Sequence, residues 1–201
     1  MSIPSRLIEE AVNEVSKLPG IGKKTALRLV LHMLKEDKGY TFNISQALTN
    51  LRENVKYCKH CHNISDHEEC DICVSNSRDR AILCVVEDIR DVMAIENTHQ
   101  YNGLYHVLGG VISPIERVGP SDLKVDTLLS RIPGSEIKEV ILALSPTMEG
   151  DTTAFYLSRK LKEATSVKVS TTAKGIPMGG ELEYMDEVTL GRSITARTYE
   201  S

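Results

Sequence analysis

Four cysteines within a short stretch constrain this chain more than any other feature of its sequence. They form two C-x-x-C pairs, Cys58/Cys61 and Cys70/Cys73, separated by eight residues. Two such pairs joined by a short loop can place four thiolates at the corners of a tetrahedron, the arrangement that zinc prefers in closed structural sites. A redox pair is the alternative, but it needs only two cysteines and usually a thioredoxin-like setting. The spacing therefore predicts a structural zinc site with all four cysteines as ligands and with His60, His62 and His67 outside the first shell.

Composition and the remaining cysteine indicate a globular chain of a reducing compartment. The 201 residues are 41% hydrophobic and 26% charged, which is enough apolar material for a core. No apolar run approaches the ~18 residues of a membrane helix, and the first residues lack the apolar segment of a signal peptide. Cys84 lies inside an apolar run, so we expect it to be a small buried residue. These features predict a cytoplasmic protein without a membrane partner.

Charge is divided unevenly along the chain. The net charge is -4, yet residues 1–60 hold 10 Lys and Arg against 6 Asp and Glu, while residues 61–201 hold 14 against 22. Ordinary fluctuation is one interpretation. The other is a basic module, suited to a polyanion, attached to an acidic one.

Hydrophobic periodicity divides the chain at the same place. Helical spacing runs through three stretches before the cysteines, residues 5–17, 23–36 and 44–56. Beyond them, short apolar runs typical of buried strands alternate with helical patterns, with strands at 81–86, 140–144 and 167–169 and helices at 88–97, 121–132 and 152–163. Such alternation predicts an α/β layer with a mostly parallel sheet.

The connection between the first two helices carries a candidate phosphate site. Gly20 and Gly22 permit positive φ angles and a tight reversal, and they leave the start of the second helix bare. Its free N–H groups and positive dipole end can receive a phosphate, with Lys23, Lys24 and Arg28 around it. A plain helical hairpin with solvated lysines is the alternative. The pattern Pro-Gly-Ile-Gly-x-x-x-Ala is more specific than two glycines alone and favours phosphate binding.

Acidic residues follow two of the predicted strands. Glu87 comes directly after the strand at 81–86, with Asp91 one helical turn further, and Glu149 and Asp151 come shortly after the strand at 140–144. In a parallel sheet both segments emerge at the carboxyl edge, where ligands collect. Such carboxylates suit Mg²⁺. The alternative is that they are first-turn helix acids stabilised by the helix dipole.

In order and spacing, these features resemble the RecR family of bacterial recombination mediators over nearly the whole chain. The matching segments are LPGIGKKTALRL, YCKHCHNISDHEECDIC, RDRAILCVVED, YHVLGGVISPIERVGP, EVILALSPTMEGDTTAFYLSR and GIPMGGELEYMDEVTLGRS. The resemblance implies a multi-domain α+β chain. We expect a helix-hairpin-helix domain over 1–56, a four-cysteine zinc finger over 57–78, a Toprim domain over 79–175, and a C-terminal loop and helix that makes subunit contacts over 176–201.

The resemblance also implies a function. Family members bind single- and double-stranded DNA without sequence preference and act with RecO and RecF to load RecA, without turnover chemistry. They assemble as dimers or ring-like tetramers, and they act at the nucleoid. Residues Glu87, Glu149 and Asp151 match the Toprim acids, associated in this family with partner contact and with Mg²⁺.

The sequence leaves two other functions open. A Mg²⁺-dependent Toprim nuclease would need only the acids and a metal. A zinc-stabilised protein-interaction module would make no DNA contact.

Two positions depart from the family pattern. Ser145 stands where the family often has Asn, and Thr171 stands where Arg is usual, with Lys174 as a nearby substitute.

Overall fold

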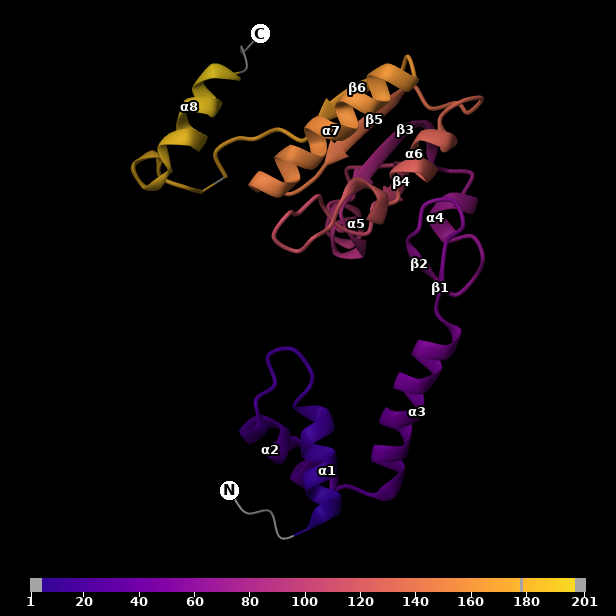
Figure 1. Ribbon diagram of the computed structural model, residues 1–201, viewed down its shortest axis with the longest axis vertical. Coiled ribbons are helices and arrows are strands. Elements are labelled where there is room, and N and C mark those ends of the chain that lie inside the picture. Colours follow the sequence, from indigo (N-terminus) through magenta and orange to yellow (C-terminus); the bar gives the residue numbers. More distant parts are fainter. Residues whose placement is uncertain (1–4, 178, 198–201) are drawn as a thin grey trace. The chain divides into compact units, whose positions relative to one another are not determined.

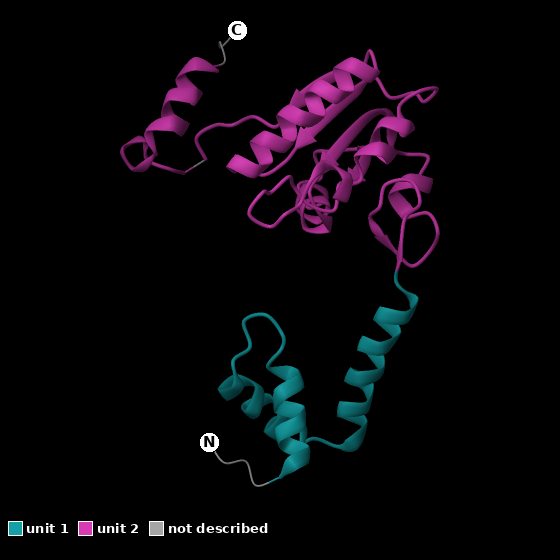
Figure 2. Ribbon diagram, viewed as in Figure 1, with its two compact units in different colours: residues 1–55 teal, residues 56–201 magenta. Residues whose placement is uncertain are grey.

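The computed structural model describes residues 5–177 and 179–197, and the chain divides into two compact units. The first unit covers Met1–Val55 and the second Lys56–Ser201 (Figure 2). Of the expected end segments, residues 1–4, Met178 and residues 198–201 lie outside the described residues. Along the part that is described, no helix is both long and apolar enough to cross a membrane.

The core of the first unit is a helical hairpin. Helix α1 (Arg6–Val15) packs on α2 (Lys23–Met33) through Val12, Ala26 and Val30, which are nearly inaccessible to solvent. Ala26 has no exposed surface, and its small side chain lets the two helices approach closely. The periodicity of the sequence predicts both helices.

Helix α3 (Lys38–Asn54) begins earlier than the predicted 44–56 stretch. Asp37 caps it, because its carboxylate accepts a hydrogen bond from the backbone N–H of Tyr40 at 3.1 Å. None of its residues is buried in the chain. Its large apolar side chains are exposed, namely Tyr40, Phe42, Leu48 and Leu51.

The cysteine segment opens the second unit as a small ribbon. Strands β1 (Lys56–Tyr57) and β2 (Ile64–Ser65) pair antiparallel, and the short helix α4 (Asp71–Val74) follows them. The first C-x-x-C pair follows β1, and the second lies at α4, with Cys70 as its N-cap residue and Cys73 within the helix.

A four-stranded parallel sheet forms the body of the second unit (Figure 1). Its strands are β3 (Asp79–Val86), β4 (Gly103–Val107), β5 (Glu139–Ala143) and β6 (Lys168–Thr171), in the order β4-β3-β5-β6. The sequence patterns predict three of these strands and miss β4. All five residues of β4 are buried, including His106, whose Nε2 hydrogen-bonds to the carbonyl oxygen of Lys124 at 2.8 Å.

Helices cover both faces of the sheet. Helices α6 (Val125–Arg131) and α7 (Met148–Ala164) pack on the face that carries Leu83 and Val85. Helix α5 (Ile89–Glu96) packs on the opposite face, with Cys84 and Val86, and Cys84 is buried as expected. Because alternate residues of β3 point to opposite faces, a continuous apolar run fits this central strand.

The remaining segment carries short elements. The 3-10 turn η1 (Pro120–Asp122) precedes α6, and η2 (Leu182–Tyr184) precedes helix α8 (Glu187–Thr195). Helix α8 lies within the stretch expected to be helical near the C-terminus. None of its described residues is buried, and Val188 and Ile194 are exposed.

Candidate functional sites

The turn between α1 and α2 leaves the amino end of α2 open. Gly20 has φ +78°, the left-handed region that favours glycine. The same expectation is wrong for Gly22, whose φ is -78°, because it is the extended N-cap residue of α2. Apart from the adjoining residues, no atom of the described part of the chain lies within 4 Å of where a Cβ would stand at either glycine. The backbone of this turn is therefore accessible to a ligand.

The charges around this helix end favour an anion. Helix α2 begins with Lys23 and Lys24, has no acidic residue in its first turn, and receives no side-chain hydrogen bond at its N-cap. Cations at the positive end of a helix dipole are unfavourable unless an anion lies nearby. Lys23, Lys24 and Arg28 are exposed, and within the described residues none of them forms an ion pair. These cations destabilise the amino end of α2 when it is empty and would stabilise a phosphate bound there.

A groove along α2 extends the basic surface beyond the residues that the motif identifies. It has a volume of about 420 Å³ and is lined by Lys24, Leu27, Arg28, Leu31, His32 and Lys35. The sequence motif does not identify Lys35. The helical spacing from Lys24 through Arg28 to Lys35 is the pattern from which its place on this surface could have been predicted.

The four cysteines converge as their spacing predicts. Their sulfur atoms all lie within 4.8 Å of one another, and the Sγ atoms of Cys61 and Cys70 are 3.5 Å apart. A zinc tetrahedron with Zn–S bonds of ~2.3 Å has sulfur–sulfur edges of about 3.8 Å. All four side chains are buried, and among the described residues no histidine joins the set. The geometry and the donor type therefore fit zinc.

The contacts between these thiols shift their pKa values. A hydrogen bond with Cys70 raises the pKa of the Cys61 thiol, and the same contact lowers the pKa of Cys70. Several thiolates cannot lie buried side by side without a cation, because like charges repel strongly where little solvent screens them. A bound metal ion would replace those protons.

The cysteine module is anchored on the free edge of β4. The backbone N–H of Val107 donates to the carbonyl oxygen of Cys61 at 2.8 Å. His62 hydrogen-bonds through Nε2 to the hydroxyl of Thr127 at 2.9 Å, and its ring meets that of His106 edge-on, with centroids 5.2 Å apart. The module thus covers an edge that would otherwise present unpaired backbone groups.

The acids after β3 serve first as helix caps. Asp88 caps α5 and pairs with Arg90, while the Asp91 carboxylate accepts hydrogen bonds from the backbone N–H groups of Glu87 and Asp88 at 3.1 Å each. Glu87 has a different environment. Burial, with Asp91 and Asp88 nearby, raises the pKa of its carboxyl.

The acids after β5 face cations of the same chain. Asp151 pairs with Lys174, and Arg192 of α8 lies 3.7 Å from it. The hydrogen bond from Lys174 lowers the pKa of Asp151. Glu149 lies in the first turn of α7 and is half-buried. Lys174 lies near Thr171, where the family usually has Arg, but it already forms an ion pair with the carboxylate of Asp151.

The two groups of acids do not form a ready metal site. Over residues 5–177 and 179–197, only the four cysteines form a set of three or more metal-binding side chains within reach of one ion. Both acidic segments do follow paired parallel strands, β3 and β5, as the pattern predicts.

Comparison with known families identifies each segment. The RecR helix-hairpin-helix model matches residues 8–52, the RecR four-cysteine zinc finger model 55–75, the Toprim domain model 81–173, and the RecR C-terminal model 175–198. Their order, with the parallel sheet and its helices, confirms the expected fold class.

Curated relatives match along nearly the whole chain. The Recombination protein RecR of Cytophaga hutchinsonii is 65% identical over 199 residues, covering 98% of this chain and 97% of the relative. Those of Phocaeicola vulgatus and Flavobacterium johnsoniae are 61% and 59% identical, covering 97% and 98% of this chain and 95% of each relative. On this evidence the chain belongs to the RecR family of recombination proteins.

Proposed function

We propose that this protein is a non-enzymatic mediator of DNA recombination that binds DNA through the amino end of α2. The observation that carries the proposal is the start of α2, where no side chain caps the helix and no acidic residue lies in the first turn with Lys23 and Lys24. Bare N–H groups and neighbouring cations bind phosphate oxygens. Gly20 and Gly22 admit the sugar–phosphate backbone, and Arg28 extends the contact along the groove.

Contacts of this kind carry no base information. Phosphate contacts position a protein on DNA, whereas groove contacts read sequence. We therefore propose binding to single- and double-stranded DNA without sequence preference. A location beside the chromosome, in the cytoplasm, is part of the same proposal, and four cysteines placed to hold a metal rather than to form disulfides support it.

Assembly into a dimer or tetramer would strengthen this weak site. Helix α3 exposes Phe42, Leu48 and Leu51, and α8 exposes Val188 and Ile194. Exposed apolar side chains of this kind are suited to contact with further copies of the chain. Several copies of one phosphate site on a single DNA would raise avidity without a strongly basic subunit.

The zinc finger has a structural role in this proposal. Cys58, Cys61, Cys70 and Cys73 would hold Zn²⁺ in a closed four-thiolate site, which has no open position for a substrate. Its contacts with β4 fix it to the Toprim domain.

For the acids, partner contact is favoured over magnesium. Asp151 already faces two cations, and Asp91 is occupied as a helix cap. We propose that Glu87, Glu149 and Asp151 belong to the surface that meets RecO- and RecF-type partners. Glu149→Ala should then keep the fold and DNA binding but weaken partner binding. Tight, stoichiometric Mg²⁺ binding that Glu149→Ala abolishes would favour the metal instead.

The proposal is tested by loading of a RecA-type recombinase. Gapped DNA is coated with single-strand-binding protein, the partners and the recombinase are added, and filament formation is followed with and without this protein. Faster filament formation in the presence of this protein, with the DNA left chemically unchanged, supports a mediator. Metal-dependent nicking of supercoiled DNA by the purified protein, lost on Glu87→Gln, would instead support a nuclease.

A further inference from the structure

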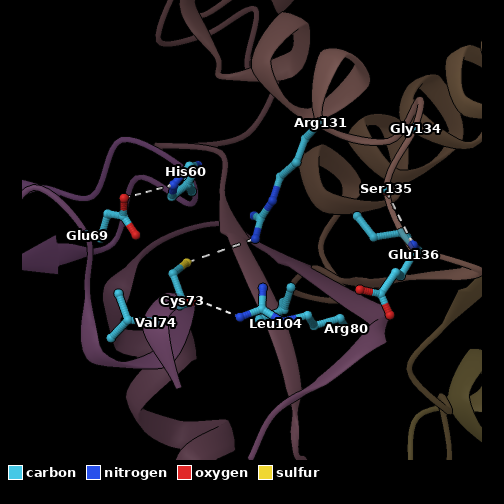
Figure 3. Close-up of a pocket in the computed structure, with 11 residues that line it drawn as sticks. His60, Glu69, Cys73, Val74, Arg80, Leu104, Arg131, Gly134, Ser135 and Glu136 are labelled. Carbon is cyan, nitrogen blue, oxygen red and sulfur yellow. Dashed lines mark hydrogen bonds and ion pairs between the residues drawn. The ribbon is translucent and has the colours of Figure 1, made fainter. Parts of the chain in front are cut away.

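Two arginines of the Toprim domain reach the last cysteine of the zinc finger. They lie with Cys73 in a cavity of about 510 Å³ (Figure 3). Arg131, at the end of α6, donates from Nη1 to the carbonyl oxygen of Tyr105 at 2.6 Å, and its Nη2 lies 4.0 Å from the Cys73 Sγ. Arg80 of β3 donates from Nη2 to the carbonyl oxygen of Cys73 at 3.4 Å.

Neither guanidinium has a carboxylate partner over residues 5–177 and 179–197. Within the described residues, every ion pair involves other groups, and no Asp or Glu oxygen lies within 4.0 Å of Arg80 or Arg131. Arg131 is also half-buried. A partly desolvated cation without a counter-ion is costly, so its charge should be balanced by another group in contact with it.

The cysteine cluster can supply that balance. Four thiolates around one Zn²⁺ leave two negative charges, shared over the sulfur atoms. Cys73 is the most accessible of the four ligands, with 8% of its surface exposed, and the guanidinium of Arg131 faces it. The half-buried Arg131 lies beside the Cys73 sulfur, and the exposed Arg80 contacts the Cys73 carbonyl oxygen, so two positive charges lie near these two negative ones.

We propose that Arg131 is a positioning residue of the zinc site, which holds the Cys73 thiolate and balances its charge with help from Arg80. Outer-shell partners of this kind orient metal ligands and raise metal affinity. The proposal rests on the proposed four-thiolate zinc site. An external anion in the same cavity is disfavoured, because the thiolates already balance the arginines and Glu69 and Glu136 also line the cavity.

The second hydrogen bond of Arg131 extends its role. Tyr105 belongs to β4, the edge strand, and its carbonyl oxygen receives the same guanidinium that faces Cys73. One side chain thus connects the metal ligand to the sheet. Loss of the metal would leave Arg131 without its counter-charge, so zinc occupancy and the stability of this edge should change together.

The test compares variants of the full-length protein. Arg131→Met keeps an unbranched apolar stem and removes the guanidinium with its charge, whereas Arg131→Lys keeps the charge and removes the planar fork. Arg159→Met is the control, because Arg159 lies on α7 and pairs with Glu163 at 2.8 Å. Zinc affinity is measured by competition with a colorimetric chelator at fixed pH. Co²⁺-substituted protein then reports the thiolate-to-metal charge-transfer bands.

Arg131→Met should weaken zinc binding by about 10- to 100-fold, with Arg131→Lys in between and Arg159→Met unchanged. The charge-transfer bands should shift in Arg131→Met, because a thiolate that loses a donor becomes a stronger electron donor to the metal. Folded Arg131→Met with wild-type affinity and an unchanged Co²⁺ spectrum would overturn the inference. If Arg131→Met does not fold, Arg131→Lys decides by the same two readouts. Wild-type protein that binds no zinc would refute the zinc site itself, a separate outcome.

Discussion

His106 makes the stability of the second unit depend on pH in a way that can be calculated. Its side chain has no exposed surface, and its Nδ1 has no hydrogen-bond partner among the residues that the structure describes. Burial lowers the pKa of its imidazole to about 3, from a usual value of 6.5. As pH falls below the usual value, the unfolded chain binds a proton there that the folded protein does not accept. Stability is therefore lost progressively between the unfolded-state pKa and the folded-state pKa.

The magnitude follows from the same linkage. Between pH 7 and pH 5 the imidazole contributes a loss of about 2 kcal/mol, because pH 5 lies below one pKa and well above the other. A folded-state value one unit higher would scarcely change this figure. His106→Gln should be less stable than the wild type at pH 7, since the smaller side chain leaves a void in the core.

The assay is urea unfolding of wild type and His106→Gln at several pH values from 7 to 5. Other groups, including the zinc ligands, titrate in both proteins, so the difference between the two isolates His106. That difference should narrow by about 2 kcal/mol towards pH 5. A constant difference across this range, with equal zinc content, would refute the reasoning.

Three further changes test other parts of the fold. Cys58→Ser should lose zinc and lower the unfolding midpoint, because metal binding is coupled to folding, whereas Cys84→Ser should keep its zinc; equal zinc content in both would contradict the assigned ligands. Gly150→Ala should cost about 1–3 kcal/mol in chemical denaturation, since its Cβ would lie 2.0 Å from the carbonyl oxygen of Ser145, while Gly191→Ala, with open space, should cost nothing. Glu96→Gln should lower the free energy of unfolding by ~1 kcal/mol at pH 7, because it removes the ion pair with Arg78. The hydrogen bond from Arg78 lowers the pKa of Glu96, so this stabilisation is lost as the pH falls through that pKa and the cost of the substitution should shrink in acid. A cost that is the same at pH 3 would count against the ion pair.

The sequence predicts those features that depend on local spacing. Two C-x-x-C pairs are close enough to converge in almost any loop, and the four sulfur atoms do so. The helical hairpin follows from the period of its apolar residues, and three of the four strands follow from their short, continuous apolar runs.

Features that depend on tertiary contacts escape such prediction. Strand β4 contains His106, and nothing local indicates that the Lys124 carbonyl will satisfy a buried imidazole. The φ of Gly22 depends on its place as an N-cap. Arg131 lies 58 residues from Cys73 along the chain, so its position beside the thiolate is visible only in the folded protein.

The most direct test of the account is DNA binding by the purified protein across a salt series. Anisotropy of a labelled single strand is measured for the wild type and for Lys23→Glu/Arg28→Glu, with light scattering to verify assembly. Lys17→Glu/Arg159→Glu is the control, because it makes the same charge change at cations that already pair with Glu14 and Glu163.

Each phosphate contact on a single strand contributes about 0.7 to the slope of log affinity against log salt. We expect the wild type and the control to bind DNA in a salt-sensitive way. The assembled Lys23→Glu/Arg28→Glu protein should bind much more weakly, and its slope of log affinity against log salt should be smaller by about 1.4 for each engaged subunit. An assembled Lys23→Glu/Arg28→Glu protein that binds DNA with wild-type affinity and slope would contradict the claim that the amino end of α2 holds the DNA.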